Sequence, residues 1–378
     1  MPNLFRKRGP AGQGIGGTPF DHALDALLTA TLSLPAFIAI LLVFSLLGGN
    51  AKAEGTLEDA TETSAASPSC GARSLLPDLE RSGALASMET AAAIVPNGEG
   101  KLFRIEKDGL APSYLFGTMH MSDPRILALP AETQGALDAS RRLVIETTDM
   151  LDEAKMSALV FTRPDLLNLP DGKVLKDVLT PAQMAEADRL LAADGIPLQS
   201  VERLQPWFVA IGLLFPACEA SRMEAGEKPL DLRLALDAEE DGKEVLGLET
   251  GAEQLEVIAS LPMDIQISSL IATLALKDTL PDIFETMTEL YLSGRIAMIT
   301  PLSEAVMPLG LVSEESRKGY AAFEKRIVTD RNHTMARRLG SILSKGETFV
   351  AVGALHLPGA EGLVELLRAY GFRLTRLD

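Results

Sequence analysis

The sequence predicts an α/β protein with a central mixed sheet and a large helical insertion in its middle. Apolar runs typical of strands occur near both ends of the chain, at residues 101–117 and 349–377. Between about 151 and 343, apolar residues instead recur mostly at helical spacing. The chain has 378 residues, 47% of them apolar, so it can bury a large core.

Each predicted strand is a short apolar or alternating run bounded by turn residues. The predicted strands are residues 101–107, 113–117, 142–146, 244–248, 349–353 and 372–377. Asp108-Gly109 is a turn signal that makes the first two strands a hairpin. The third strand follows a helix, which is the order of a β-α-β unit.

The predicted helices have apolar residues at helical spacing. They are residues 75–87, 131–140, 182–193, 207–215, 230–240, 252–260, 265–292, 313–344 and 359–370. Thr180-Pro181 supplies an N-cap and a first-turn proline for the helix that starts at residue 182. We expect these helices to lie over or beside the sheet.

Residues 1–53 predict a signal peptide or an N-terminal membrane anchor. Basic residues at 6–8 precede an uncharged apolar run at 26–49, and Ala-Lys-Ala at 51–53 fits a cleavage site. A run of about 20 apolar residues can also span a bilayer, so membrane attachment through residues 26–49 stays open. Basic residues ahead of the run keep the amino terminus in the cytoplasm. Either way, the rest of the chain is expected to be extracytoplasmic, as in a periplasm.

Residues 54–69 are small, polar and acidic, which predicts a disordered linker before a domain at 70–378. The chain has two cysteines, Cys70 and Cys218. Outside the cytoplasm these two can form a disulfide, and two buried free thiols are the alternative.

The composition argues against nucleic acid as a partner. The formal net charge is −17, whereas binding a polyanion requires a basic surface. Aromatic residues make up 5% of the chain, so no stacking platform for bases is indicated.

Two of the four histidines end the same short pattern, Gly-x-x-His after an apolar run. These are Gly117 with His120 and Gly353 with His356. Open α/β sheets bind ligands at the carboxyl ends of their strands, and imidazole is the commonest metal-binding side chain. The glycines let the backbone approach a ligand closely. The pattern predicts one shared site, against the alternative of two structural histidines.

Polar side chains that could complete this site also follow strands or begin helices. Glu146 ends the strand at 142–146, where a buried carboxylate must be ion-paired or metal-bound; a glutamate at the rim, paired with an arginine, is the alternative. Arg331 could pair with Glu146 or with a substrate carboxylate, or face solvent. Glu249 and Gln254 follow the strand at 244–248, and capping or packing roles stay open for both.

Two histidines and one carboxylate make a thin ligand set. Asp330, Glu249 or backbone oxygens are therefore candidates to extend it. A set of imidazole and oxygen donors suits manganese, cobalt or zinc and is not a thiolate-type metal site. The chain contains no Gly-x-Ser-x-Gly, His-Glu-x-x-His or phosphate-binding Gly-x-x-x-x-Gly-Lys-Ser/Thr motif.

Taken together, these motifs resemble the TraB/GumN family, from about residue 70 to the carboxyl terminus. That family is similar to the Tiki metalloproteases and, more distantly, to the erythromycin-esterase and ChaN-like folds. The resemblance is carried by residues 113–120, by Leu248-Glu249-Thr250 with Gln254, by Asp330-Arg331-Asn332 with Met335, and by residues 352–359 with Gly362-Leu363.

The resemblance implies a core of two related β-α halves, each contributing one Gly-x-x-His. It also implies a divalent metal, manganese or cobalt by preference, and cleavage of peptide bonds. Carried onto this sequence, it implicates His120, Glu146 and His356, with Arg331 in support. Residues in the matching motifs are expected to support the site or bind substrate: Gly117, Thr118, Gly353, Glu249, Gln254, Asp330 and Asn332.

The function predicted from the sequence is a metal-dependent hydrolase, a peptidase acting on extracytoplasmic peptides or proteins. His120 and His356 would bind the metal, and Glu146 would complete the ligand set or accept a proton from water. Arg331 would orient a carboxylate or stabilise an oxyanion. The alternative is a non-catalytic protein that sequesters a peptide or assists polysaccharide export, with structural histidines.

Overall fold

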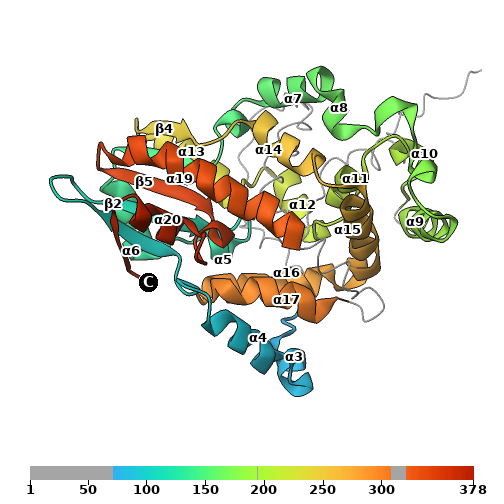
Figure 1. Cartoon of the computed structure of the whole chain (residues 1–378), viewed down its shortest axis with the longest axis horizontal. Coiled ribbons are helices and arrows are strands. Elements are labelled where there is room, and N and C mark those ends of the chain that lie inside the picture. Colours follow the sequence, from blue (N-terminus) through green and yellow to red (C-terminus); the bar gives the residue numbers. More distant parts are fainter. Residues whose placement is uncertain (1–70, 194, 308–320) are drawn as a thin grey trace, which may run out of the picture.

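Six strands form one mixed sheet, which lies in the left half of the molecule in Figure 1. The computed structural model describes residues 71–193, 195–307 and 321–378. The strands lie in the order β4-β3-β5-β2-β1-β6. Their bounds are β1 (Leu102–Glu106), β2 (Ser113–Thr118), β3 (Arg142–Ile145), β4 (Glu244–Gly247), β5 (Thr348–Gly353) and β6 (Arg373–Arg376). The predicted α/β class with a mixed central sheet is confirmed.

The four strands β4, β3, β5 and β2 run parallel, whereas β1 is antiparallel to both β2 and β6. β5 comes from near the carboxyl terminus, and it lies between β2 and β3, which come from the first half of the chain. In the register of β2 and β5, Thr118 is opposite Gly353. Parallel strands end at the same edge of a sheet, so the segments that follow β2, β3 and β5 emerge side by side.

Helices cover both faces of the sheet because the strand residues are apolar on both sides. On one face, α19 (Asp330–Leu343) and α20 (Leu363–Ala369) pack against residues such as Val350 and Val352 (Figure 1). On the other face, Phe116 and Phe349 join a larger core with α13 (Leu230–Glu240) and α16 (Leu280–Leu292). The rings of Phe116 and Phe349 lie 5.8 Å apart between centroids.

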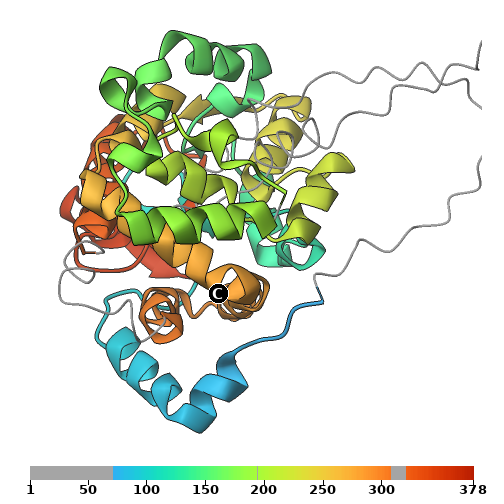
Figure 2. The same ribbon diagram turned by 90° about the vertical axis from the view of Figure 1, so that its right-hand side faces the viewer.

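The middle of the chain is helical, as predicted, and part of it has its own apolar cluster around Val201, Val209 and Leu270. The remaining α-helices are α3 (Leu76–Ser82), α4 (Ala84–Ala93), α5 (Pro124–Leu127), α6 (Ala131–Asp138), α7 (Glu153–Thr162), α8 (Pro164–Leu167), α9 (Pro181–Ala193), α10 (Leu198–Val201), α11 (Pro206–Gly212), α12 (Ala217–Glu224), α14 (Gly251–Ala259), α15 (Met263–Leu276) and α17 (Ile299–Val306). Figure 2 shows α3 and α4, in blue, along the lower margin beneath the orange helices. The short helices are η2 (Asp149–Leu151), η3 (Pro170–Gly172), η4 (Leu175–Asp177), η5 (Lys277–Thr279), η6 (Ile296–Met298), η8 (Lys325–Thr329) and η9 (Ala354–His356).

Three predicted helices differ from the expected single regular helix. The helix expected at 75–87 is two helices, because Gly83 has a φ of 79° between them. The stretch at 265–292 is divided by the 3₁₀ turn at Lys277–Thr279. The helix expected at 313–344 begins outside the described residues, and within them a π-helical turn at Lys325–Thr329 precedes α19.

The predicted leader and linker, at 1–69, and Cys70 lie outside the described residues. Cys218, on α12, is disulfide-bonded, and its pairing with Cys70 stays a prediction. Among the described helices, none is by itself long and apolar enough to cross a bilayer. Two consecutive helical segments, Gly251–Ala259 and Met263–Leu292, are together long and apolar enough, but the chain bends by 94° between them.

Candidate active site

Three neighbouring strand ends bring together the residues predicted from the sequence. His120 lies two residues beyond β2, Glu146 directly follows β3, and His356 ends η9 just after β5. The relative exposures of His120, Glu146 and His356 are 1%, 2% and 0%, so all three lie inside the fold. Burying a polar or charged side chain without a partner is energetically costly, so buried side chains of this kind are paired with one another or with a ligand.

The two imidazoles face the same oxygen of Glu146. Its Oε1 lies 3.6 Å from His120 Nε2 and 3.8 Å from His356 Nε2. The backbone N–H of Gly353 also donates to this oxygen, at 2.8 Å. A Cβ at Gly353 would lie 3.2 Å from Glu146 Oε1 and 3.4 Å from His120 Nε2. The absence of a side chain there therefore keeps the space among the three groups open.

The other glycine of the pattern has a packing role. A Cβ at Gly117 would lie 2.9 Å from Ala354 Cα, which is closer than such atoms approach. Its carbonyl accepts a hydrogen bond of 3.0 Å from the buried Tyr291 hydroxyl. Gly117 thus lets the end of β2 pack against the segment that carries His356.

Hydrogen bonds on the outer side of each imidazole fix its orientation. His120 Nδ1 donates to Asp231 Oδ2 at 2.5 Å, and Asp231 Oδ1 accepts from the Thr118 hydroxyl at 2.6 Å. His356 Nδ1 donates to Asn332 Oδ1 at 2.5 Å. Such partners are typical of metal-binding histidines, because they hold the ring with Nε2 directed toward the metal.

The second oxygen of Glu146 belongs to a buried ionic network. Arg331 Nη2 donates to Glu146 Oε2 at 2.6 Å and to Glu249 Oε2 at 2.5 Å. Gln254 Nε2 donates to the same two oxygens, at 3.2 and 3.3 Å. Arg331 Nη1 also donates to the carbonyl of Ile327, in the π-helical turn that precedes α19. Arg331 is 3% exposed and is therefore not the solvent-facing helix charge considered as an alternative.

The structure places one predicted residue outside this network. Asp330 is exposed on α19, where its carboxylate forms an ion pair with Lys325. The reason is helical geometry: neighbouring residues point about 100° apart, so the turn that buries Arg331 turns Asp330 outward. Asn332 is buried again and reaches His356.

Burial and charge shift the protonation equilibria in different directions. Burial opposes ionisation of Glu146, but the Arg331 guanidinium and the imidazoles outweigh it and hold the pKa of Glu146 well below its usual range. Burial also disfavours a charged His120, yet the carboxylates of Asp231 and Glu146 raise the pKa of His120 to about 10. Burial lowers the pKa of His356 to about 3, because Glu146 offsets it only in part.

The donor set fits a divalent cation in charge and chemistry. Within residues 71–193, 195–307 and 321–378, no three His, Cys, Asp or Glu side chains already stand in metal-ligand geometry. However, His356 Nε2 is buried with no hydrogen-bond partner among the described residues. Two atoms bound to one ion at about 2.1 Å lie roughly 3.4–3.6 Å apart, close to the separations between Nε2 and Oε1.

The buried charges of the site also favour a bound cation. The carboxylates of Glu146, Glu249 and Asp231 are buried, and Arg331 is the buried cation that contacts two of them. Three negative charges against one positive leave an excess of two, which is costly inside a protein. One divalent ion would neutralise this excess, and without an ion the proton that His120 holds at its raised pKa offsets one of the two charges.

Sequence reasoning missed Asp231 and Tyr291. Asp231 interrupts the apolar face of α13, between Leu230 and Leu234, which are both buried. A carboxylate in the buried phase of an amphipathic helix is a signal that could have identified it. Tyr291 occupies an ordinary core position of α16, and nothing in its local sequence marks its contact with Gly117.

The fold is a mixed sheet with a buried His-Glu-His cluster at the carboxyl ends of three of its parallel strands. The sequence profile of the TraB/PrgY/gumN family matches residues 101–376, and the chain belongs to this family. The match includes every strand and all the buried residues of the cluster.

Relatives with assigned names are distant. The chain is 25% identical over 316 residues to metalloprotease TIKI1 of Danio rerio and 26% identical over 308 residues to metalloprotease TIKI2 of Xenopus tropicalis. These alignments cover 72% and 70% of this chain but 62% and 57% of the relatives. The chain thus spans about three fifths of the proteins it resembles. No solved structure matches it significantly.

Proposed function

We propose that this chain is a metal-dependent hydrolase that cleaves peptide bonds outside the cytoplasmic membrane. The observation that carries this proposal is the convergence of His120, Glu146 and His356 from three adjacent strand ends. The distant relatives named metalloproteases support it. Manganese, cobalt or zinc would suit these nitrogen and oxygen donors.

In this proposal His120 Nε2, His356 Nε2 and Glu146 Oε1 hold the ion. A bound divalent ion supplies Lewis-acid chemistry, which polarises a carbonyl group and makes water a stronger acid. Asp231 and Asn332 keep the imidazoles oriented, since each accepts the Nδ1 proton and leaves Nε2 for the ion.

Arg331 acts through Glu146 rather than on the substrate. Its guanidinium is engaged by Glu146, by Glu249 and by the carbonyl of Ile327. It therefore keeps Glu146 ionised and holds Oε2 in place, so that Oε1 faces the imidazoles. Gln254 supports the same carboxylate with a second hydrogen bond.

Metal content and peptide cleavage test the proposal together. The purified full chain is expected to retain a divalent ion and to cleave members of a peptide library, and chelation should abolish cleavage. His120→Ala and Glu146→Gln should each lower kcat/KM by at least about 100-fold and reduce metal content. His333→Ala, at an exposed histidine on α19, is the matched control and should retain the metal.

Two outcomes separate the alternatives. Undiminished cleavage by metal-free His120→Ala protein would rule out metal-dependent hydrolysis at this site. Tight peptide binding with no cleavage, in protein loaded with each of the three ions, would instead favour a sequestering protein.

An extracytoplasmic location is a separate part of the proposal. It rests on the basic residues at 6–8 and the apolar run at 26–49. A carboxyl-terminal alkaline phosphatase fusion should be active, because that enzyme requires an oxidising compartment to form its disulfides. An inactive fusion with a full yield of protein would contradict export.

A further inference from the structure

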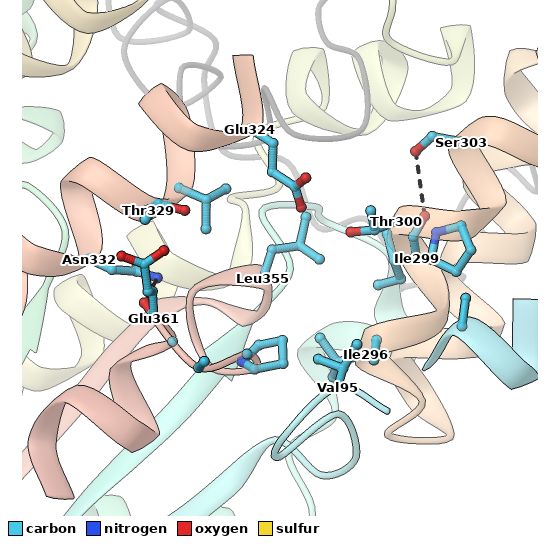
Figure 3. A pocket seen from close by; sticks show the side chains of 18 of the residues that line it. Val95, Ile296, Ile299, Thr300, Ser303, Glu324, Thr329, Asn332, Leu355 and Glu361 are labelled. Carbon is cyan, nitrogen blue, oxygen red and sulfur yellow. Dashed lines mark hydrogen bonds between the residues drawn. The ribbon is translucent and has the colours of Figure 1, made fainter. Parts of the chain in front are cut away.

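A second, larger pocket lies beside the buried cluster. Its volume is about 470 Å³, within the usual range for ligand sites. It lies between the segment after α4, the η6–α17 segment, the start of α19 and the loop after η9 (Figure 3). A cavity of about 30 Å³ lined by His120, His356 and Gly353 adjoins it, and the two share Ile299 and Leu355.

The larger pocket is acidic. Three glutamates line it, Glu304, Glu324 and Glu361, and no lysine, arginine or histidine is among its lining residues within the described chain. Glu361 accepts a hydrogen bond from His333 at 3.0 Å. The side chains of Glu304 and Glu324 have no ion-pair partner among residues 71–193, 195–307 and 321–378.

Glu324 is the central carboxylate of this pocket. Figure 3 shows its side chain extending from the helix toward Leu355 and Thr300. Burial, with a further contribution from the charge of Glu304, raises the pKa of Glu324. A half-buried carboxylate that repels its neighbour and has no counterion would be stabilised by a cation between the two.

Asn332 and Leu355 connect the pocket to the buried cluster. Asn332 lines the pocket and accepts the Nδ1 proton of His356. On the inner side of Leu355, the buried Nε2 of His356 has no hydrogen-bond partner in the described part of the chain. A ligand lying in the pocket and passing Ile299 and Leu355 would therefore meet that nitrogen.

We propose that this pocket is a substrate subsite for a lysine or arginine side chain of a peptide whose scissile bond lies at the His120–Glu146–His356 cluster. This inference rests on the proposed hydrolase function and specifies its substrate. Glu324 and Glu304 receive the cationic group, while Leu355, Ile299 and the alanines of the lining contact the aliphatic stem. A neutral or acidic side chain at this position leaves the carboxylates without a partner.

Cleavage of matched peptides by the full chain tests specificity. A neutral host peptide carries one lysine, or the isosteric norleucine, at each position in turn. At one position relative to the cleaved bond, the wild-type kcat/KM should be about tenfold higher with lysine, the usual effect of one charge-assisted contact. Glu324→Gln should lower kcat/KM for the lysine peptide several-fold more than for the norleucine peptide, with Glu304 left as the remaining carboxylate.

The control is Glu132→Gln, on α6, because Glu132 is an exposed glutamate that does not line the pocket. It should leave both peptides unchanged. Equal wild-type rates for lysine and norleucine at every position would overturn the inference. So would an equal loss on both peptides in Glu324→Gln, because that indicates general damage.

Binding separates this inference from the hydrolase proposal. Fluorescence anisotropy with labelled peptides and the wild-type chain should give a Kd about tenfold lower for the best lysine peptide than for its norleucine partner. Glu324→Gln should reduce this difference in Kd several-fold. If binding discriminates and nothing is cleaved, the subsite stands and the hydrolase proposal fails. If peptides are cleaved but lysine and norleucine peptides bind equally well, the hydrolase proposal stands and the subsite inference fails.

Discussion

Replacing Arg331 with methionine tests the central ionic network. Arg331 is 3% exposed and contacts both Glu146 and Glu249, which are also buried. Methionine fills similar space without charge, so Arg331→Met leaves two carboxylates together in the interior. Breaking a buried pair by removing one partner costs about 3–5 kcal/mol. Gln254 still donates to both carboxylates, which keeps the loss within that range.

The dependence on pH provides an internal check. In the wild type the pKa of Glu146 is held well below its usual range, so the network stabilises the fold above about pH 4.3 and loses this effect as the pH falls further. Without Arg331, burial dominates and the pKa of Glu146 rises. The variant should therefore gain stability on acidification, and its deficit relative to the wild type should shrink between pH 7 and pH 4.

The measurement is urea unfolding of both proteins with chelator present, so that a metal does not contribute. Arg331→Met/Glu249→Gln should recover part of the loss, because only one carboxylate then lacks its partner. Arg189→Met, in an exposed pair with Glu186 on α9, is the matched control and should unfold at the wild-type midpoint. An Arg331→Met variant that also unfolds at the wild-type midpoint at pH 7 would refute the reasoning.

Three further predictions concern packing and metal binding. Gly117→Ala should cost about 1–3 kcal/mol in urea unfolding, because its Cβ would clash with Ala354; Gly135→Ala, in helix α6 with open space around it, should instead gain about 0.5–1 kcal/mol. Asp231→Asn should weaken metal binding about 10- to 100-fold in calorimetric titration, since His120 loses its carboxylate partner, and unchanged affinity would count against the site. Chelation should lower Tm, by the equivalent of about 2.7 kcal/mol at a metal concentration of 100 Kd, and an unchanged Tm would contradict a metal bound to the folded state.

The strands were the most predictable part of the fold. All six lie within one residue of the predicted bounds, because apolar alternation and turn residues are local signals. The helical middle was harder to divide. An apolar pattern at 265–292 continues through the 3₁₀ turn at Lys277–Thr279 and conceals the break, although Pro281 in the first turn of α16 is a local signal of a new helix start.

A residue of the site was predictable where it stands at a strand end or in a recognisable motif. His120, Glu146 and His356 met the first condition, and Arg331 was found through its neighbours in a motif. Asp231 was missed because its bond to His120 joins positions 111 residues apart along the chain. For the same reason, the local pattern around Asp330 and Arg331 predicted support from both, whereas the helix buries only Arg331.

The sequence by itself determined which segments are strands and which polar side chain follows each one, since both depend on a few adjacent residues. Only the tertiary structure decided that β5 lies between β2 and β3. Buried parallel strands are apolar on both faces, so their composition does not select a neighbour, and hydrogen bonding between distant segments does. That strand order is the physical reason why two imidazoles and one carboxylate share a single interior site.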